Sequence, residues 1–176
     1  FENINLDLMY ALPGQTIEAC MDDLECAISL DPQHLSFYQL TLEPNTEFYV
    51  KPPTLPDDDV AWTIQEQGVD RLAQAGYRQY EVSAYAKAGC ECLHNRNYWE
   101  FGDYLGLGAG AHGKITTIAS GEVVRHWNHR HPEQYMDHSL NGDAISGSSV
   151  LKEHDLCFEF MLNALRLRDG FPTTLY

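Results

Sequence analysis

Apolar side chains in the first part of the chain recur with the period of a strand, then of a helix, then of a strand. Residues 4–10, with the sequence INLDLMY, place apolar side chains at even positions on one face and Asn, Asp and Met on the other. Helical spacing follows, from an N-cap at Thr16 to Asp31-Pro32, where proline ends the run. A second strand is expected at 35–42. Strand, helix and strand with short connections predict parallel pairing in an α/β fold.

The rest of the chain continues with the same two patterns. Prolines within 52–56 mark an extended link, and a helix is predicted over 58–74. Alternation predicts one strand at 80–85 and another, shorter one at 121–125. A final helix is expected near 150–168. Its apolar face needs a partner and consists of Leu156, Cys157, Phe160, Met161, Ala164 and Leu165.

Length and charge narrow the class of protein. A chain of 176 residues with 44% hydrophobic content forms one domain with a core, or one large part-domain with a short appendage. With 26 acidic residues against 11 Lys and Arg, its formal charge of −15 disfavours nucleic-acid partners and anionic lipid. No apolar run reaches the roughly 20 residues of a membrane-spanning helix, so no integral membrane segment is expected.

The cysteine content indicates the redox compartment of the protein, and the first residue bears on whether the chain is a fragment. The five cysteines are an odd number, and two of them lie in a helical pattern. A disulfide framework is therefore not expected, and a reducing, cytoplasmic location is. The chain opens at Phe1 without a Met, directly before a strand. We therefore expect a fragment of a longer protein.

Asp7 is a carboxylate within an apolar strand, near the carboxyl end where parallel sheets and barrels place their ligand sites. A buried carboxylate needs a partner, because desolvation of an unpaired charge is costly. Two interpretations are open at this point. Asp7 either binds a ligand or hydrogen-bonds to the backbone of the following turn.

The segment 94–113, HNRNYWEFGDYLGLGAGAHG, combines aromatic residues with glycines. Gly106–Ala111 matches a loose dinucleotide motif, but the β-branched residues that follow suit a strand rather than the required helix. The glycines instead allow close approach to a ligand or to another chain segment, or a bend at a barrel corner. His94 and His112 flank the aromatic residues, as an axial ligand beside porphyrin-stacking rings would. A histidine that only hydrogen-bonds is the alternative.

Other chemistries find less support. Cys90, Cys92 and His94 raise zinc as a ligand, but no second cysteine pair completes a structural site. Neither a nucleophile elbow nor a Walker loop is present, which argues against hydrolases and nucleotide triphosphatases. A further group of histidines is expected in a solvated loop without metal-site spacing, namely His126, His129, His131 and His138.

Five segments along the chain are distinctive: NLDLMYALPGQT, HLSFYQLTLEPNT, GYRQYEVSAYAK, HNRNYWEFGDYLGLGAGAHGK and EFMLNALRLRDGF. In this order they resemble the haem-chaperone branch of the oxygen-independent coproporphyrinogen III oxidase family, within the radical S-adenosylmethionine superfamily. The resemblance implies an α/β fold: the late part of a partial (β/α) radical-SAM barrel with extra strands over 1–146. The start of a small helical C-terminal domain would follow over 147–176.

The resemblance also implies site residues. Asp7 falls on the family's aspartate that contacts S-adenosylmethionine, Met9 on an apolar residue at the adenine, and Thr41 where backbone groups meet the adenine. His94-Asn95-Arg96-Asn97-Tyr98-Trp99 matches the branch motif HNxxYW, which implies His94 as ligand to haem iron, with Tyr98 and Trp99 beside the ring.

Three departures from the family pattern are visible. The CxxxCxxC motif that holds the 4Fe-4S cluster is absent, so the cluster ligands are expected outside this chain. Ala11 stands where glycine is usual, which would stiffen the turn before Leu12-Pro13. Ala84 stands where asparagine is common, which removes a polar group near the barrel mouth.

The function implied for the whole protein is that of a haem chaperone, which binds haem and delivers it to respiratory cytochromes. The alternative is the oxidase reaction, decarboxylation of coproporphyrinogen III to protoporphyrinogen IX by an S-adenosylmethionine-derived radical. The HNRNYW segment favours the chaperone. A third hypothesis is that the isolated chain is an inert structural part of a barrel, with an exposed edge that invites self-association.

Overall fold

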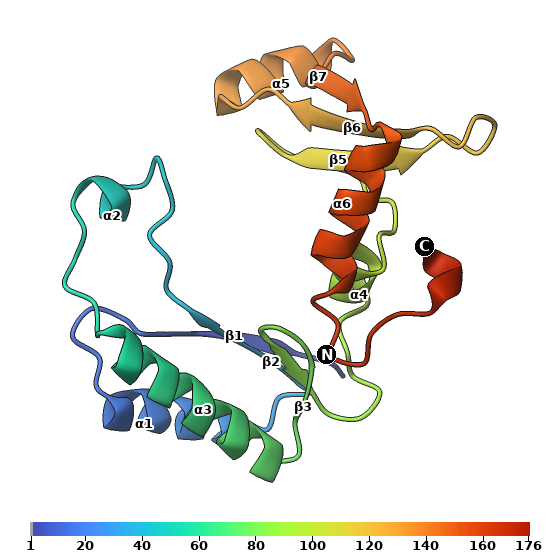
Figure 1. Cartoon of the computed structure of the whole chain (residues 1–176). Coiled ribbons are helices and arrows are strands. Elements are labelled where there is room, and N and C mark those ends of the chain that lie inside the picture. The colour runs from blue at the N-terminus through green and yellow to red at the C-terminus, as the bar shows by residue number, and fades with distance from the viewer. Residues whose placement is uncertain (1) are drawn as a thin grey trace. The chain divides into compact units, whose positions relative to one another are not determined.

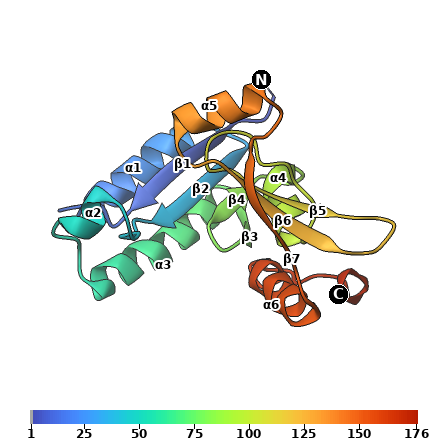
Figure 2. The ribbon, with the colours of Figure 1, turned by 90° about the horizontal axis from the view of Figure 1, so that it is seen from above.

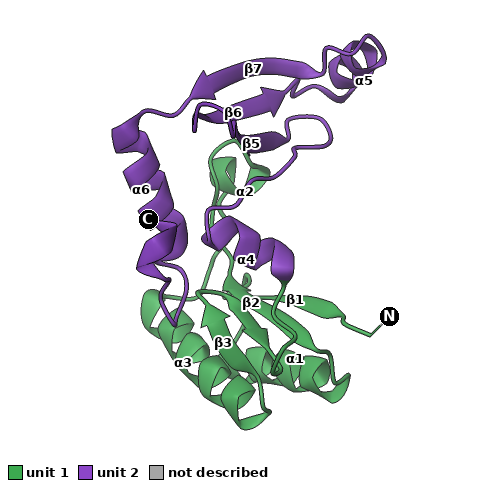
Figure 3. Ribbon diagram, turned by 90° about the vertical axis from the view of Figure 1, so that its right-hand side faces the viewer, with its two compact units in different colours: residues 1–92 green, residues 93–176 purple. Residues whose placement is uncertain are grey.

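The structure, a computed structural model, describes residues 2–176. Its contacts divide the chain into two compact units, residues 1–92 and 93–176, which are coloured separately in Figure 3. The predicted division into domains 1–146 and 147–176 concerns the architecture of the family rather than compactness, and it stays a prediction. None of the helices formed by residues 2–176 combines the length and the apolar character needed to cross a bilayer.

The first unit is a four-stranded sheet in the order β1-β2-β4-β3. β1 and β2 are parallel, as predicted, and β4 runs antiparallel to both β2 and β3. Figure 1 shows two helices on one face of this sheet, and Figure 2 shows them running alongside β1 and β2. The elements of this unit are β1 (Asn5–Tyr10), α1 (Ile17–Ser29), β2 (His34–Gln39), α2 (Glu47–Val50), α3 (Asp58–Gln74), β3 (Arg78–Glu81) and β4 (Ala84–Ala86).

The alternation in β1 and β2 separates an apolar face from a polar one. Leu6 and Leu8 pack against the core, whereas Asn5 and Asp7 are exposed on the opposite face. Parallel partners share a face, so Asp7 lies beside Ser36 of β2. The core between the sheet and the helices α1 and α3 contains Tyr10, Ala11, Cys20, Leu24, Ala27, Leu35, Phe37, Ala61, Ile64, Leu72, Tyr77 and Tyr85.

The N-terminal ends of α1 and α3 are set by capping side chains. The predicted N-cap Thr16 accepts a hydrogen bond from the Ala19 amide at 3.2 Å. Asp57 caps α3 by accepting from the Val60 amide at 2.8 Å. α3 spans Asp58–Gln74, which confirms the prediction of a helix over 58–74.

The prediction of one strand over 80–85 is wrong. β3 and β4 are separate strands of a hairpin that turns at Val82 and Ser83, with a register shift beside Glu81. The buried Glu81 carboxylate closes the turn, because its Oε1 accepts from the Ser83 amide at 3.1 Å and from the Ser83 hydroxyl at 3.0 Å. Side-chain alternation continues through so short a turn, so the pattern does not reveal it.

Ala11 occupies a backbone conformation that favours glycine. Its φ is +55°, in the left-handed region, and its side chain is buried. A Cβ atom disfavours this region, so the alanine strains the turn that follows β1. The glycine that the resemblance implies at this position would adopt the conformation without strain.

The second unit is an antiparallel three-stranded sheet in the order β5-β6-β7 with helices around it. The helix predicted at 150–168 is shorter at both ends, because Val150 belongs to β7 and pairs with Val124. The strand predicted at 121–125 is longer and ends at Asn128. The elements of this unit are α4 (Leu93–Trp99), β5 (His112–Thr116), β6 (Val123–Asn128), α5 (Pro132–Leu140), β7 (Ile145–Val150), α6 (Glu153–Ala164) and a 3-10 helix (Thr173–Leu175).

The prediction of a solvated loop for the histidine-rich segment is also wrong. His126 is part of β6, His131 is the N-cap of α5, and His138 lies within α5. The His129 and His138 rings stack with centroids 4.0 Å apart. The hydrophobic pattern does not predict the end of β6 or the helix α5, because polar residues interrupt the apolar face of each.

Gly106 and Gly113 allow close packing within the chain. Residue 104 forms a bridge with Lys114 of β5, which brings the glycine-rich segment against that strand. A Cβ atom on Gly106 would overlap the His112 carbonyl, and one on Gly113 would lie 3.1 Å from the Gly106 nitrogen. Of the interpretations open from sequence, approach to another chain segment accounts for these two positions.

Gly68 of α3 provides a test of packing in the first unit. A Cβ atom there would lie 2.9 Å from Cζ of the buried Phe37. We expect Gly68→Ala to lower the free energy of unfolding by about 1–3 kcal/mol through overpacking, despite the better helix propensity of alanine. Urea unfolding followed by circular dichroism measures the change. The exposed neighbour gives a control, Gln67→Ala, which should have little effect; a stabilised Gly68→Ala would contradict the packing.

Candidate functional sites

Asp7 lies on the exposed face of β1, opposite the helices α1 and α3. Its Oδ1 accepts a hydrogen bond of 2.8 Å from the Asn5 amide group, two residues earlier on the same face. Within residues 2–176, no hydrogen bond joins the Asp7 side chain to the following turn. The carboxylate is thus held by a neighbouring side chain and remains open to a ligand.

Asn5 connects Asp7 to a buried histidine. Asn5 Oδ1 lies 2.6 Å from His34 Nδ1 and also accepts from the Ser36 hydroxyl at 3.2 Å. On the other side of the ring, His34 Nε2 lies 2.8 Å from the hydroxyl of Tyr80. Burial lowers the pKa of His34, although the charges of Asp7 and Glu81 act in the opposite direction.

The two other residues proposed for S-adenosylmethionine also lie in the first unit. Met9 is half-buried, two residues after Asp7 on the same face of β1. Thr41 is exposed just beyond the end of β2, and its hydroxyl donates to Glu43 Oε1 at 2.9 Å. The strand spacing brings Asp7 and Met9 onto one face, and Thr41 follows the end of the adjacent parallel strand.

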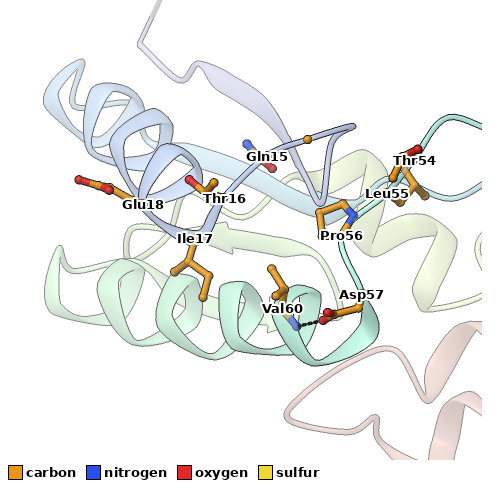
Figure 4. Close-up of a pocket in the computed structure, with 10 residues that line it drawn as sticks. Gln15, Thr16, Ile17, Glu18, Thr54, Leu55, Pro56, Asp57 and Val60 are labelled. Atoms are coloured by element: carbon orange, nitrogen blue, oxygen red, sulfur yellow. Dashed lines mark hydrogen bonds between the residues drawn. The ribbon is translucent and has the colours of Figure 1, made fainter.

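A cavity of about 540 Å³ lies elsewhere in this unit, between the turn after β1 and the start of α3. Figure 4 shows that Thr16 and Asp57, the caps of α1 and α3, both border it. These caps already satisfy helix amides, and both Asp57 and Glu18 oppose an anionic ligand. None of the residues proposed from the sequence belongs to the lining, which is Gly14, Gln15, Thr16, Ile17, Glu18, Thr54, Leu55, Pro56, Asp57 and Val60.

The residues proposed for haem lie on α4 of the second unit. His94 is exposed, and its ring meets the Tyr98 ring edge to face at 4.7 Å between centroids. Their separation of four residues places both side chains on one side of the helix. Trp99 follows with its ring centroid 6.3 Å from that of Tyr98. The structure thus brings His94, Tyr98 and Trp99 together on a short helix.

Tyr98 is supported by side chains that the sequence analysis missed. The Tyr104 ring lies 4.3 Å from the Tyr98 ring, and its hydroxyl accepts from Arg125 Nη1 at 2.7 Å. Arg125 also donates through Nε to Glu159 Oε2 at 2.7 Å. Although burial disfavours its charge, the hydrogen bond to Glu159 and the contacts with Tyr104 raise the pKa of Arg125. These groups join α4, β6 and α6 behind the exposed histidine.

A buried lysine fixes the segment that carries Tyr104. The Lys114 side chain is only 3% exposed, and its Nζ donates to the Phe101 carbonyl at 2.8 Å and lies 3.3 Å from Asp103 Oδ1. Burial lowers the pKa of Lys114, and Asp103 partly offsets that effect. Asp103 in turn accepts from the Thr116 amide at 2.8 Å. No sequence motif predicts these contacts, because Lys114 lies 13 residues from Phe101 and 11 residues from Asp103.

Trp99 carries an enclosed donor. Its indole Nε1 is buried without a hydrogen-bond partner among the described residues, and the Arg166 guanidinium lies 4.2 Å from the ring centroid. The unpaired donor is costly in a closed environment. The enclosed donor thus lies on the residue that follows Tyr98 in α4.

The residues present do not fit an iron–sulfur cluster. Residues 2–176 contain no group of three or more His, Cys, Asp or Glu side chains arranged to hold a metal ion. Cys90 and Cys92 are half-buried free thiols, and the Cys90 thiol lies 3.8 Å from the Ala88 carbonyl.

The buried His34 predicts a pH dependence of stability. Its pKa in the folded protein is below the ordinary value of about 6.5, so the unfolded chain binds a proton that the folded chain resists. The stability that neutral His34 contributes is present above about pH 6.5 and is lost as the pH falls through its folded pKa. Between about pH 7.5 and pH 5.5, the urea midpoint should therefore fall more for the wild type than for His34→Gln.

The control for this prediction is His131→Gln, because His131 is exposed at the N-cap of α5 and makes no capping hydrogen bond. This variant should keep the pH dependence of the wild type. The same slope in all three proteins would show that His34 titrates as it does in the unfolded chain.

Comparison with known proteins places these sites in a family. No family model matches the chain. It is 52% identical over 171 residues to the heme chaperone HemW of Haemophilus influenzae, which covers 97% of this chain and 43% of that protein. It is 50% identical over 170 residues to HemW of Escherichia coli, covering 97% of this chain and 44% of the relative. The chain thus spans less than half the length of these relatives.

A solved structure supports the fold. Coproporphyrinogen III oxidase (HemN) from Escherichia coli, described as a radical SAM enzyme, matches with a TM-score of 0.74 over 93% of this chain and 40% of that chain. The identity of 22% makes this a likeness of fold, and it confirms the α/β radical-SAM architecture expected from the sequence. Given also the identity to HemW proteins over nearly its whole length, the chain belongs to the HemW family.

Proposed function

We propose that this chain carries the haem-binding residues of a haem chaperone of the radical S-adenosylmethionine superfamily, which binds haem and delivers it to respiratory cytochromes. The observation that carries the proposal is the exposed His94 on α4, with Tyr98 packed against its ring. The names of the relatives, heme chaperone HemW, support the same function.

The α4 site has the chemistry that haem ligation requires. A neutral imidazole binds haem iron through one ring nitrogen, and the His94 side chain is exposed to solvent. The described residues make no hydrogen bond to its ring nitrogens, so coordination breaks no existing hydrogen bond. The half-buried Tyr98 and Trp99 place aromatic rings near it, a side-chain type suited to the flat macrocycle.

Haem is the cargo in this proposal, and the support behind His94 is rigid. Tyr98 rests on Tyr104, and the hydroxyl of Tyr104 is fixed by Arg125 and its ion pair with Glu159. A ligand held by packed and hydrogen-bonded neighbours keeps its orientation when iron binds. The His94 ring would therefore be oriented before haem binds.

S-adenosylmethionine is proposed as a cofactor of the whole protein, bound here by Asp7, Met9 and Thr41. The exposed Asp7 carboxylate can accept hydrogen bonds from ribose hydroxyls, and the half-buried Met9 offers apolar surface to an adenine. Together with a 4Fe-4S cluster, this cofactor supplies a carbon-centred radical. The cluster ligands would come from residues other than those of this chain.

We propose that the protein is located in the cytoplasm. The proposed recipients of its haem are respiratory cytochromes. The formal charge of −15 repels anionic lipid headgroups. Delivery to a membrane-bound cytochrome would therefore depend on contact with the recipient protein rather than on lipid charge.

A haemin titration tests the assignment of His94. The wild-type chain should show a saturable shift of the Soret band, and His94→Ala should lose it. Loss of an iron ligand should weaken binding by more than the about 10- to 100-fold that removal of an outer-shell partner of a metal ligand costs. Absorbance at increasing haemin concentration measures both the affinity and the ligation state.

The matched control is His112→Ala, because His112 flanks the same aromatic segment but is exposed at the start of β5. This variant should bind haemin as the wild type does. If His94→Ala and the wild type give the same spectra and affinity, His94 is not the ligand. If His112→Ala alone loses the band, the ligand lies on β5.

A further inference from the structure

We propose that Asn5, His34 and Tyr80 form a positioning relay that orients the Asp7 carboxylate toward a ligand with neighbouring hydroxyl groups, such as a ribose. The inference rests on the proposed S-adenosylmethionine site at Asp7 and adds the residues that hold that site. Each of the three acts through another residue, so none of them is assigned direct contact with the ligand.

The relay runs across the polar face of the sheet. Asn5 donates to Asp7 Oδ1 at 2.8 Å, Asn5 Oδ1 lies 2.6 Å from His34 Nδ1, and His34 Nε2 lies 2.8 Å from the Tyr80 hydroxyl. These residues come from β1, β2 and β3, so the relay spans the sheet from one edge strand to the other.

Small residues on the intervening strand make this contact possible. β4 lies between β2 and β3, and its Ala86 pairs with His34. Ala84 and Ala86 form a buried cluster with Tyr80 on this strand pair. Because alanine side chains do not extend far from the sheet, the imidazole of His34 reaches the phenol of Tyr80 over them.

The hydrogen bonds determine the tautomer of His34. The Asn5 amide nitrogen faces the Asp7 carboxylate, which accepts, so Asn5 Oδ1 is the atom toward the histidine. A carbonyl oxygen cannot donate, so His34 must carry its proton on Nδ1. Neutral His34 then accepts at Nε2, and the Tyr80 hydroxyl donates to it. Each hydrogen bond of the relay therefore points toward Asp7. Tyr80 donates to His34, His34 donates to Asn5, and Asn5 donates to Asp7.

The buried end of the relay fixes its exposed end. His34 is 2% exposed and Tyr80 is 4% exposed, whereas Asn5 and Asp7 are exposed. The Ser36 hydroxyl adds a second donor to Asn5 Oδ1 at 3.2 Å. Rotation of the amide by half a turn would set its NH2 group against both donors, so the Asn5 side chain has one orientation.

That orientation decides what Asp7 can offer a ligand. The Asn5 amide occupies Oδ1, which selects one orientation of the carboxylate and leaves Oδ2 for incoming donors. A carboxylate that is ordered before binding loses less conformational freedom when the ligand arrives. The relay therefore raises the affinity for a hydroxyl-bearing ligand without touching it.

The first test is nitrogen-15 NMR of His34 in the ligand-free chain, with assignment by the loss of its signals in His34→Gln. We expect a proton on Nδ1 and an unprotonated Nε2 at neutral pH. In Tyr80→Phe, the Nε2 signal should move, because its hydrogen-bond donor is removed. A proton on Nε2 in the wild type would overturn the relay, whatever the ligand is.

The second test is calorimetric titration with S-adenosylmethionine. Asn5→Leu should raise Kd about five- to tenfold, within the range that one ordinary hydrogen bond contributes, and Tyr80→Phe about twofold to threefold. Asn3→Leu makes the same exchange at an exposed position two residues earlier and should leave Kd unchanged. Asp7→Asn should abolish the measurable binding.

The outcomes separate the relay from the site that it serves. If Asp7→Asn abolishes binding while Asn5→Leu binds as tightly as the wild type, the ligand site stands and the relay is refuted. If Asp7→Asn binds as the wild type does, the S-adenosylmethionine site is refuted, and the relay has no ligand to orient. Weaker binding by Asn5→Leu and Tyr80→Phe, with an Nδ1 proton on His34, supports both.

Discussion

The parallel hydrogen-bonded ladder between β1 and β2 determines where each side chain of the first unit points. Its register pairs Leu6 with Leu35 on the face that packs on α1 and α3, and Asp7 with Ser36 on the other. A slip by one residue would exchange the faces, burying carboxylate and amide groups while exposing leucines. The same apolar burial that stabilises the sheet therefore sets the polar residues in place.

In the second unit, charged side chains perform the comparable task. Arg125 joins Glu159 of α6 to Tyr104, and Lys114 ties the backbone near Phe101 to β5. Lys114 is almost fully buried and Arg125 is partly buried. Burying a charge is costly unless hydrogen-bonded partners surround it, and both cations have such partners. The geometry of α4 thus depends on a few specific electrostatic contacts, whereas the first unit depends on a broad apolar core.

The sequence is informative where one physical signal dominates. The helix α3 and the strand pair β1 and β2 follow from a clear period with capping or turn residues at the ends. The pattern fails at β3 and β4, where the Glu81 side chain closes a turn that keeps the alternation. It also fails at α4, α5 and β7, which are short and lack a continuous apolar face.

The candidate sites divide in the same way. Asp7 and His94 are distinctive within their local sequence, and the resemblance to a known family implies both as candidate site residues. The residues behind them, such as His34, Tyr80 and Arg125, cannot be inferred from spacing. His34 and Tyr80 meet at a separation of 46 residues, and Arg125 and Glu159 at 34. Only a folded chain brings such pairs together.

The glycine-rich segment that follows α4 has an energetic consequence. Glycine has the greatest backbone freedom of all residues, and a run of glycines would ordinarily give a mobile loop that must become ordered when a ligand binds. Here the contact of Gly106 with His112, and the bridge between Tyr104 and Lys114, order the segment as the unit folds. The entropy is lost once, in folding, so a molecule arriving beside Tyr104 does not have to offset it again.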